Sequence, residues 1–500
     1  MAILDLVFLT VALLGGAQSI RMPSVISDAP KLLLLSFDGF RYDYLDRPVL
    51  KPNFDFAINK GVRAKYMKST FATKTDPNHM TMVTGLWEES HGVVSNKMYD
   101  PKYREIFWMN SSDPKWWDGD GRVEPLWITN ERTEGRYSGV VNWPGGDVKY
   151  GGRLPTYSTG PYNRSIPYTD RIDAMVRWFL DDEKPMNLGL LFFEEPDRSG
   201  HLYGPDSPQV DDAIMMIDDT VGYLVSALKE ADLYDKVNLI LTSDHGMVEV
   251  SPTRVIELNR YIKPEWYIWV DDSPVSAILP KKGKEEQIYK KLRSAHVRMK
   301  VFKKKDIPKQ WHYRNNRRIM PIIAVADDGW SIVQNFTQNA FTIKGNHGYN
   351  NSIIKMSAFF IAFGPAFEEG LTSKPFCNVD LYPLMCKILD IEPRPNNGSL
   401  ETVKHILFDY DSMASQGTGI AVFCTLLLVV ALMAGGYYYW ARHYGQKEEP
   451  IVGEYVNLDE TIPQEGGGGG VPYEQQEQHL NLKNQTKASY GQEQGYGGTQ

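Results

Sequence analysis

Cysteine is scarce in this sequence, because only three of its 500 residues are cysteines, which is few for an exported protein. Cys377 and Cys386 lie nine residues apart around one predicted helix (NVDLYPLMCKIL), and Cys424 lies in a long apolar run. Nine helical residues separate two Cα atoms by about 13 Å, too far for a disulfide unless Cys377 lies in a loop that folds back. We therefore expect Cys377 and Cys386 to be free and mostly buried.

An excess of basic charge is also missing. The net charge of −8 gives no reason to expect a nucleic acid polymer as a partner, because domains that bind nucleic acids usually carry a basic face. An anionic substrate would need local positive charge, for example from a metal ion. The sequence contains no P-loop, no serine-hydrolase elbow and no internal repeat. With 42% hydrophobic and 23% charged residues, it is typical of a globular protein with a large core.

Two apolar segments predict export and membrane anchoring. Residues 1–18 form a short apolar run that ends in small residues, as in a signal peptide, although it carries Asp5 and lacks a basic start; a buried N-terminal helix is the alternative. Residues 417–440 carry no charge, and as a helix they would measure about 36 Å, enough for a hydrocarbon core of about 30 Å. Arg442 and Lys447 follow this run, so the positive-inside rule places the C-terminus in the cytosol. The pattern predicts a single-pass type I protein of the plasma membrane.

The segments that flank this predicted span have different characters. Residues 441–500 are rich in glutamine, glycine and glutamate, which predicts a disordered cytoplasmic tail. Tyr455 in EYVNLDE would suit an SH2-type adaptor if phosphorylated, although so short a motif is frequent by chance. On the extracellular side, N-x-S/T sequons are candidate glycosylation sites that agree with export: Asn110, Asn163, Asn335, Asn350 and Asn397.

Continuous apolar runs predict the strands of a buried, mostly parallel sheet: KLLLLSF (31–37), NLGLLFF (187–193), VNLILTS (237–243) and SAFFIAF (357–363). Helical patterns that begin with Ser, Thr or Asp lie between these runs. The alternation predicts an α/β fold with helices on both faces of the sheet. Shorter alternating segments and a basic run over about 248–343 predict a small α+β insertion with an antiparallel sheet.

Carboxylates and imidazoles follow three of the predicted strands. Ligands collect at the carboxyl ends of the strands in such sheets, and there stand Asp38, then Asp197 with His201, then Asp244 with His245. Each residue alone has an ordinary explanation, because an Asp after a strand is often a helix cap and a lone His is often structural. Together with His347 in KGNHGYNN, they make six oxygen and nitrogen ligands, enough for two Zn²⁺ or similar ions.

Thr75 in FATKTDPNHM is a candidate nucleophile. A threonine before Asp-Pro is also a good N-cap, and the following pattern predicts a helix closed by Gly85. A threonine hydroxyl is too weakly acidic to attack a phosphorus ester unless a base or a metal activates it. The amides of the helix N-terminus could receive the anion. Thr75 is therefore predicted to be both cap and nucleophile.

These segments resemble the ecto-nucleotide pyrophosphatase/phosphodiesterase family of the alkaline phosphatase superfamily, and most closely its fourth and fifth vertebrate members, which are type I membrane proteins. The similarity runs from about residue 31 to 399 and is carried by SFDGFRYDYL, TKTDPNHMTMVTGLWEESHGVVSNKMYD, FFEEPDRSGHLYGPDSP, TSDHGM and GNHGYNN. It implies an alkaline-phosphatase-like catalytic domain over residues 19–412. It also implies a phosphothreonine intermediate on Thr75 and two zinc sites, one formed by Asp197, His201 and His347, the other by Asp38, Asp244, His245 and Thr75. Asn96 in SNKMYD matches the residue that stabilises a phosphate oxygen together with the amide of the nucleophile.

One position departs from this family pattern. Nucleotide-cleaving relatives commonly carry Phe or Tyr directly after the nucleophile, opposite a tyrosine matched here by Tyr162, whereas this chain has Asp76. The leading expectation is a phosphodiesterase or pyrophosphatase that releases nucleoside 5′-monophosphates from dinucleoside polyphosphates, NAD-like substrates or nucleoside triphosphates. Asp76 leaves open a choline-type phosphodiesterase with a cationic substrate group. An adhesion or receptor protein with little activity is the third expectation.

Overall fold

The computed structural model describes residues 28–109, 111–337, 341–408 and 429–443. Its contacts divide the chain into two units, residues 1–413 and 414–500. The predicted signal peptide, Asn110, Cys424, Tyr455 and nearly all of the predicted tail lie outside the described residues.

The described part of the second unit is a helix over residues 429–443. It includes the second half of the predicted membrane span, whose residues 417–428 are not described. Across the ranges that the structure does describe, no helix is long and apolar enough to cross a membrane.

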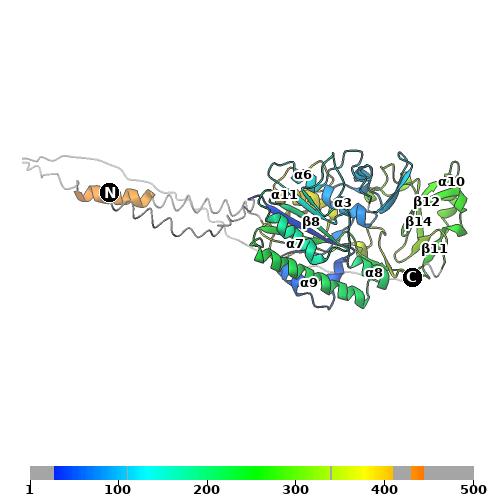
Figure 1. Cartoon of the computed structure of the whole chain (residues 1–500), viewed down its shortest axis with the longest axis horizontal. Coiled ribbons are helices and arrows are strands. Elements are labelled where there is room, and N and C mark those ends of the chain that lie inside the picture. The colour runs from blue at the N-terminus through cyan, green and yellow to red at the C-terminus, as the bar shows by residue number, and fades with distance from the viewer. Residues whose placement is uncertain (1–27, 110, 338–340, 409–428, 444–500) are drawn as a thin grey trace, which may run out of the picture. The chain divides into compact units, whose positions relative to one another are not determined.

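An eight-stranded sheet forms the centre of the first unit (Figure 1), with the strand order β19-β2-β18-β9-β1-β8-β6-β7. The strands from β9 to β7 in this order are parallel to one another. The bounds are β1 Lys31–Phe37, β2 Gly61–Ala64, β6 Ser138–Val141, β7 Tyr157–Ser158, β8 Leu188–Phe193, β9 Val237–Thr242, β18 Phe360–Phe363 and β19 Leu371–Ser373. The predicted mostly parallel α/β sheet is therefore present.

One predicted strand has the wrong direction. β18 pairs antiparallel with both β9 and β2, so the prediction of a parallel strand over residues 357–363 is wrong. A strand that is buried on both faces has the same apolar sequence in either direction, and for this reason the sequence could not distinguish them.

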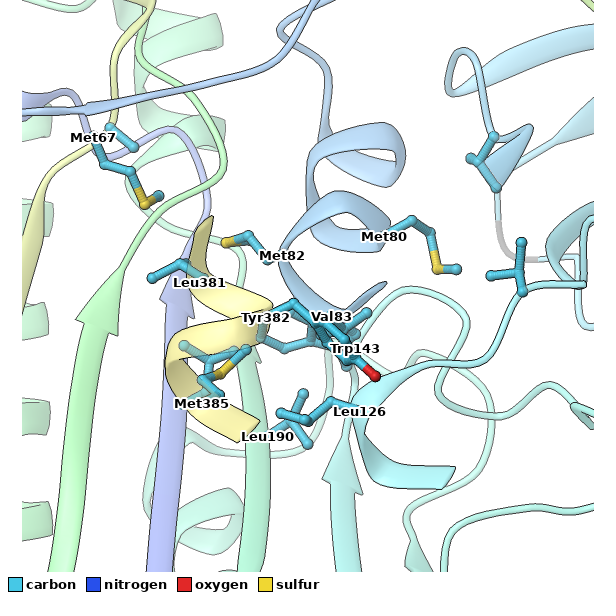
Figure 2. Close-up of a cluster of buried hydrophobic side chains, with 14 of the residues drawn as sticks. Met67, Met80, Met82, Val83, Leu126, Trp143, Leu190, Leu381, Tyr382 and Met385 are labelled. Atoms are coloured by element: carbon cyan, nitrogen blue, oxygen red, sulfur yellow. The ribbon is translucent and has the colours of Figure 1, made fainter. Parts of the chain in front are cut away.

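Helices cover both faces of the sheet, and successive residues of β1 point into different cores. Leu32 and Leu34 belong to one cluster of buried side chains, and Leu33 and Leu35 belong to the other. The first cluster lies under α3 (Thr75–Thr84), α6 (Leu126–Asn130) and α11 (Leu381–Leu389), and the second under α2 (Pro52–Asn59), α7 (Tyr168–Phe179) and α9 (Pro208–Glu230). Figure 2 shows the first, where Met82 and Val83 of α3 meet Tyr382 of α11 above Leu190 of β8. The sheet is therefore packed between two hydrophobic cores, which fixes the positions of its strands.

A smaller antiparallel sheet lies within the predicted insertion. Its order is β12-β13-β15-β14, with bounds β12 Tyr267–Asp271, β13 Val275–Pro280, β14 Met299–Lys303 and β15 Ile322–Ala326. Helix α10 (Glu285–Leu292) contributes Ile288 and Leu292 to the core of this sheet. The small antiparallel sheet expected from the alternating segments is therefore found, with one helix beside it.

Both described cysteines are free, as predicted. Cys377 ends β20 (Phe376–Cys377) and is half-buried, whereas Cys386 is buried in α11.

Candidate functional site

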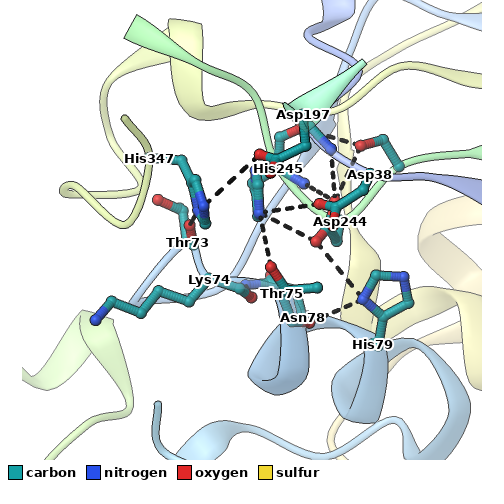
Figure 3. Close-up of polar contacts among 12 residues, drawn as sticks. Asp38, Thr73, Lys74, Thr75, Asn78, His79, Asp197, Asp244, His245 and His347 are labelled. Atoms are coloured by element: carbon teal, nitrogen blue, oxygen red, sulfur yellow. Dashed lines mark hydrogen bonds and ion pairs between the residues drawn. The ribbon is translucent and has the colours of Figure 1, made fainter. Parts of the chain in front are cut away.

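The predicted acidic and imidazole side chains meet at one edge of the large sheet (Figure 3). Asp38 follows β1, and Asp244 with His245 follows β9. Asp197 begins α8 (Asp197–Tyr203), the helix after β8 that also carries His201, and His347 follows β17 (Gly345–Asn346). The close approach of the Asp38 and Asp197 segments requires a glycine: Gly39 has φ +67°, and a Cβ there would lie 2.8 Å from Asp197 Oδ1.

The three histidines are all oriented by backbone carbonyls. Nδ1 lies 2.8 Å from the Gly345 oxygen in His201, 3.0 Å from the Gly246 oxygen in His245 and 3.0 Å from the Thr73 oxygen in His347. A carbonyl only accepts, so each Nδ1 carries the hydrogen and donates it. Each Nε2 is then left to face the carboxylates, which is how histidines that bind metals are usually held.

The carboxyl groups of Asp38 and Asp244 are buried, that of Asp197 is partly buried, and all three are incompletely bonded. Among the described side chains, one oxygen each of Asp38, Asp197 and Asp244 has no hydrogen-bond partner. Burial, together with the charges of Asp244 and Asp197, raises the pKa of Asp38 well above its ordinary value. Burial would also raise the pKa of Asp244, but the His245 and His79 rings hold it below its usual range. Unpaired oxygens of this kind, in a buried cluster, fit divalent cations, which supply the positive charge that the cluster needs.

Two groups of ligand atoms are compact enough to hold metal ions. Asp197, His245 and His347 form one group and Asp38, Asp244 and His245 the other, with all ligand atoms of a group within 4.8 Å of one another. Ligands of one Zn²⁺ lie about 2.0–2.2 Å from the ion, so they are separated by up to roughly 4.4 Å. His201 adjoins the first group, with Nε2 3.3 Å from Asp197 Oδ2. The structure thus brings together all six predicted ligands and places His245 between the two groups.

The pKa values of the imidazoles shift in different directions. Burial, with the neighbouring His245 and His201 rings, lowers the pKa of His347 well below 6.5, so His347 is neutral and able to coordinate. Burial acts in the same direction on His245, but the Asp244 carboxylate raises its pKa overall. His245 Nε2 lies 3.1 Å from Asp244 Oδ2 and 3.4 Å from Asp38 Oδ1. A metal ion bound at His245 Nε2 would take the place of a proton on that nitrogen.

Thr75 lies beside these ligands, with Oγ1 3.4 Å from His245 Nε2. The predicted capping role is wrong, because Lys74 occupies the N-cap position and Thr75 is the first residue of α3. No side chain of the cap residue bonds this helix end; instead Asn96 Oδ1 accepts a hydrogen bond of 2.9 Å from the Asp76 amide. Gly85 closes the helix at φ +65°, as predicted. Thr75 and Asn96 therefore meet at an N-terminus that favours anions.

A cleft of about 250 Å³ opens beside Thr75 and is lined by Asp38, Asp76, Tyr162 and Asp197, among others. Burial and the Asp244 charge raise the pKa of Asp76 to about 7. Asp76 Oδ2 accepts no hydrogen bond from any described residue. Tyr162 is 37% exposed and meets the edge of Phe192. The two residues predicted to recognise the substrate thus share one cleft.

Two residues that the sequence analysis did not identify, His79 and Asn78, bond the backbone around Thr75. His79 donates from Nδ1 to the Thr75 oxygen over 2.8 Å and accepts at Nε2 from the Ser36 hydroxyl over 2.9 Å. Asn78 donates to the Ala72 and Lys74 oxygens. The i to i+4 spacing of Thr75 and His79 is the sole sequence signal for this contact.

The glycosylation candidates differ in exposure. Asn163, Asn335 and Asn397 are exposed, and Asn350 is partly exposed. Their modification stays a prediction.

Comparison with known proteins places the chain in a family. The model of the family described as "Type I phosphodiesterase / nucleotide pyrophosphatase" matches residues 32–350. The chain belongs to this family. Human ectonucleotide pyrophosphatase/phosphodiesterase family member 5 is 46% identical over 404 residues, which cover 80% of this chain and 83% of that protein. Human bis(5'-adenosyl)-triphosphatase ENPP4 is 41% identical over 421 residues, which cover 84% and 91%.

Solved structures agree with this family assignment. Murine ectonucleotide pyrophosphatase/phosphodiesterase 5, in an inactive threonine-to-alanine variant bound to AMP, matches with a TM-score of 0.72 and 45% identity, over 76% of this chain and 100% of the other. These matches confirm the predicted resemblance, the α/β fold and the enzyme class of phosphodiesterases and nucleotide pyrophosphatases.

Proposed function

We propose that the chain is a cell-surface, two-zinc phosphodiesterase and pyrophosphatase that cleaves nucleotide phosphodiesters or phosphoanhydrides and releases nucleoside 5′-monophosphates. One observation carries this proposal. Three histidines, each fixed through Nδ1 by a carbonyl, turn Nε2 toward aspartates that carry unpartnered oxygens, and Nε2 of one of them, His245, lies 3.4 Å from Thr75 Oγ1. An arrangement with so much buried negative charge makes physical sense when cations bind there.

The metal ligands are proposed to be Asp38, Asp197, His201, Asp244, His245, His347 and the Thr75 hydroxyl. Bound zinc ions would lower the pKa of a coordinated hydroxyl and offset the charge of the phosphate. Thr75 Oγ1 then forms a bond to phosphorus while the oxygen of the leaving group departs with the bonding electrons. Water next attacks the phosphothreonine and restores the Thr75 hydroxyl. Asn96 and the amides of the first turn of α3 hold the phosphate oxygens.

Nucleotides are the favoured substrates. Two relatives carry printed names that refer to nucleotides, bis(5'-adenosyl)-triphosphatase and nucleotide pyrophosphatase, and the murine structure holds AMP. Tyr162 offers a partly exposed ring in the cleft beside Thr75, on which a base can stack. The net charge of −8 gives no support to a nucleic acid polymer as substrate.

The proposed topology rests on the sequence. A signal peptide over residues 1–18 and a span over 417–440 would leave residues 19–412 outside the cell as the catalytic domain, with the insertion at about 248–343. The tail over 441–500, with Tyr455 as a candidate adaptor site, would lie in the cytosol. Exposed sequons at Asn163, Asn335 and Asn397 are compatible with this arrangement.

A choline-type phosphodiesterase is the second candidate, and Asp76 favours it. Its carboxylate lies on the wall of the cleft, has an oxygen with no partner among the described residues and could receive a cationic group. An aromatic residue at this position would instead sandwich a base against Tyr162.

The test compares the full-length wild-type chain with Thr75→Ala and Asp76→Phe, in the presence of zinc. The substrates are diadenosine triphosphate, NAD, a nitrophenyl nucleotide ester and glycerophosphocholine. We expect Thr75→Ala to lose at least about 10³-fold in kcat, because the nucleophile is removed. Asp76→Phe is expected to lower KM for nucleotides about tenfold, since stacking on one aromatic face is worth ~1–3 kcal/mol. Equal activity of wild type and Thr75→Ala would refute the assignment of Thr75, and turnover of glycerophosphocholine alone would favour the second candidate.

A further inference from the structure

A second cavity, of about 350 Å³, adjoins the Thr75 cleft, and its lining includes Lys74, Asn96, Trp108 and His347. The consecutive residues Lys74 and Thr75 line different cavities, and Met109 lines both. Figure 3 shows Lys74 extending away from the aspartates and histidines. The two cavities therefore share Met109 in their linings, and the second lies beside the residue that precedes the candidate nucleophile.

A β-hairpin holds Trp108 at this second cavity. β4 (Lys97–Asp100) begins directly after Asn96, and β5 (Glu105–Trp108) returns so that Trp108 pairs with Lys97. The next pair, Met98 and Phe107, is buried in the core. Because side chains alternate along a strand, Lys97 and Trp108 point the opposite way. Trp108 therefore lies across the hairpin from Lys97, the residue that follows Asn96, and the Asn96 side chain bonds the start of α3.

The far end of the hairpin is anchored. Asp100 is buried and accepts hydrogen bonds from Arg317 Nε at 2.9 Å and from Arg318 Nε at 2.7 Å. Arg318 also donates to the backbone oxygens of Gly92 and Trp116. Charged hydrogen bonds of this kind fix the hairpin against the rest of the domain. Trp108 is thus presented on a rigid element.

Trp108 itself is 60% exposed, although tryptophan is usually well buried. Lys97 Nζ lies 4.6 Å from the ring centre and covers one face of the indole. A large, partly covered aromatic ring at the rim of a cavity is a platform on which a planar ligand can stack.

We propose that Trp108 stacks a base carried by the leaving group, so that the chain favours dinucleotides over nucleoside triphosphates. This inference rests on the proposed function. Attack by Thr75 Oγ1 breaks the bond between the α-phosphorus and the bridging oxygen, and the electron pair leaves with the β-phosphate. The leaving group departs in line with the attacking oxygen, whereas the retained nucleoside monophosphate lies to the side in the Tyr162 cleft. A leaving nucleoside diphosphate therefore needs a cavity of its own.

The test measures kcat/KM of the full-length zinc-loaded chain on diadenosine triphosphate and on ATP. Attack on the α-phosphorus transfers an AMP group from either substrate. Only diadenosine triphosphate carries a base on its leaving group. Trp108→Ala is expected to lower the ratio of the two kcat/KM values about tenfold, as the loss of one base stack predicts. Trp108→Phe is expected to restore most of the ratio, because it restores an aromatic face.

Tyr223→Ala is the matched control, because Tyr223 is an exposed aromatic residue on α9, where its hydroxyl bonds Asp173. It is expected to leave the ratio unchanged. An active Trp108→Ala variant with an unchanged ratio, or with equal losses on both substrates, would overturn the inference and leave the proposed function standing. A wild-type chain that cleaves neither of these substrates, nor NAD, nor the nitrophenyl nucleotide ester, would overturn the proposed function itself and the inference with it.

Discussion

At the scale of single residues, buried acids separate into those that a ligand could satisfy and those that remain in the core. Asp76 lies in the wall of the cleft, so a bound ligand would come close to its carboxyl group. Glu88 in α4 (Glu88–His91) is fully buried, and neither of its oxygens has a partner that meets hydrogen-bond geometry among the described residues. Burial raises the pKa of Glu88 well above 4.5, and the nearby Thr70 hydroxyl and the Glu88 amide oppose only part of that shift. A carboxyl group in this position is held in its neutral form.

We expect Glu88→Gln to stabilise the protein increasingly as the pH rises above 4.5. An acid with a raised folded-state pKa binds a proton in the folded state while the unfolded state releases it, so the wild type loses stability between the unfolded and the folded pKa. Glutamine does not titrate. The gap between variant and wild type should therefore widen by up to about 1.4 kcal/mol per pH unit in this window and then stay constant.

Thermal unfolding at several pH values measures this gap. Glu401→Gln is the control, because Glu401 is 74% exposed and pairs with the exposed Lys404. It should change stability little at any pH. A gap for Glu88→Gln that stays the same from pH 4.5 upward would show that Glu88 is not held neutral.

At the scale of elements, the sequence predicts what burial and chemistry determine locally. β1 was predicted with its observed bounds, because a strand buried on both faces is apolar throughout. The six predicted ligands could be picked out because they follow strands or lie in tight turns at one edge of the sheet. The direction of β18 was not predictable, and neither was His79, whose partners Ser36 and the Thr75 oxygen come together only in the folded chain. The one-residue error at the start of α3 arose because Asn96, distant in sequence, bonds the helix end in place of a local cap.

A buried ion pair links α3 to the smaller sheet. Lys74 Nζ lies 2.7 Å from Asp271 Oδ2, at the end of β12, and both side chains are almost fully buried. Ser95 Oγ also donates to this oxygen. Since Lys74 precedes Thr75, the pair fixes the backbone next to the proposed nucleophile. We expect Asp271→Asn to lower the free energy of unfolding by about 3–5 kcal/mol, because it leaves a buried ammonium without its counter-charge, and to lower kcat as well.

Urea unfolding followed by tryptophan fluorescence checks this expectation, with the exposed pair Lys236–Asp232 as the control. Asp232→Asn should cost less than about 1 kcal/mol. The double variant Lys74→Met, Asp271→Leu should recover much of the lost stability, because apolar side chains can replace a buried pair. A double variant that is less stable than Asp271→Asn would contradict this account of the pair.

At the scale of the whole molecule, the ligand cluster connects segments that lie far apart in the sequence, from Asp38 to His347. In the absence of metal, burial and the charges of Asp244 and Asp197 disfavour the ionised form of Asp38. Metal binding should therefore stabilise the entire first unit, by about 2.7 kcal/mol for one site at a hundredfold excess over the dissociation constant. Removal of metal with a chelator should lower the melting temperature, and added zinc should restore it.

Asp38→Asn separates the two effects of this carboxylate. Without metal the variant should melt higher than wild type, because Asp38 must on folding either bind a proton or carry a buried charge beside Asp244 and Asp197, and asparagine does neither. With zinc it should melt lower, because a ligand is lost. Thermal unfolding of both proteins, with chelator and with zinc, tests whether the difference in melting temperature changes sign. Asp219→Asn, at an exposed position of α9, is the control and should melt like wild type under both conditions. A chelator that leaves the melting temperature of wild type unchanged would refute the metal site, and the same order of stability under both conditions would refute the role of Asp38 as a ligand.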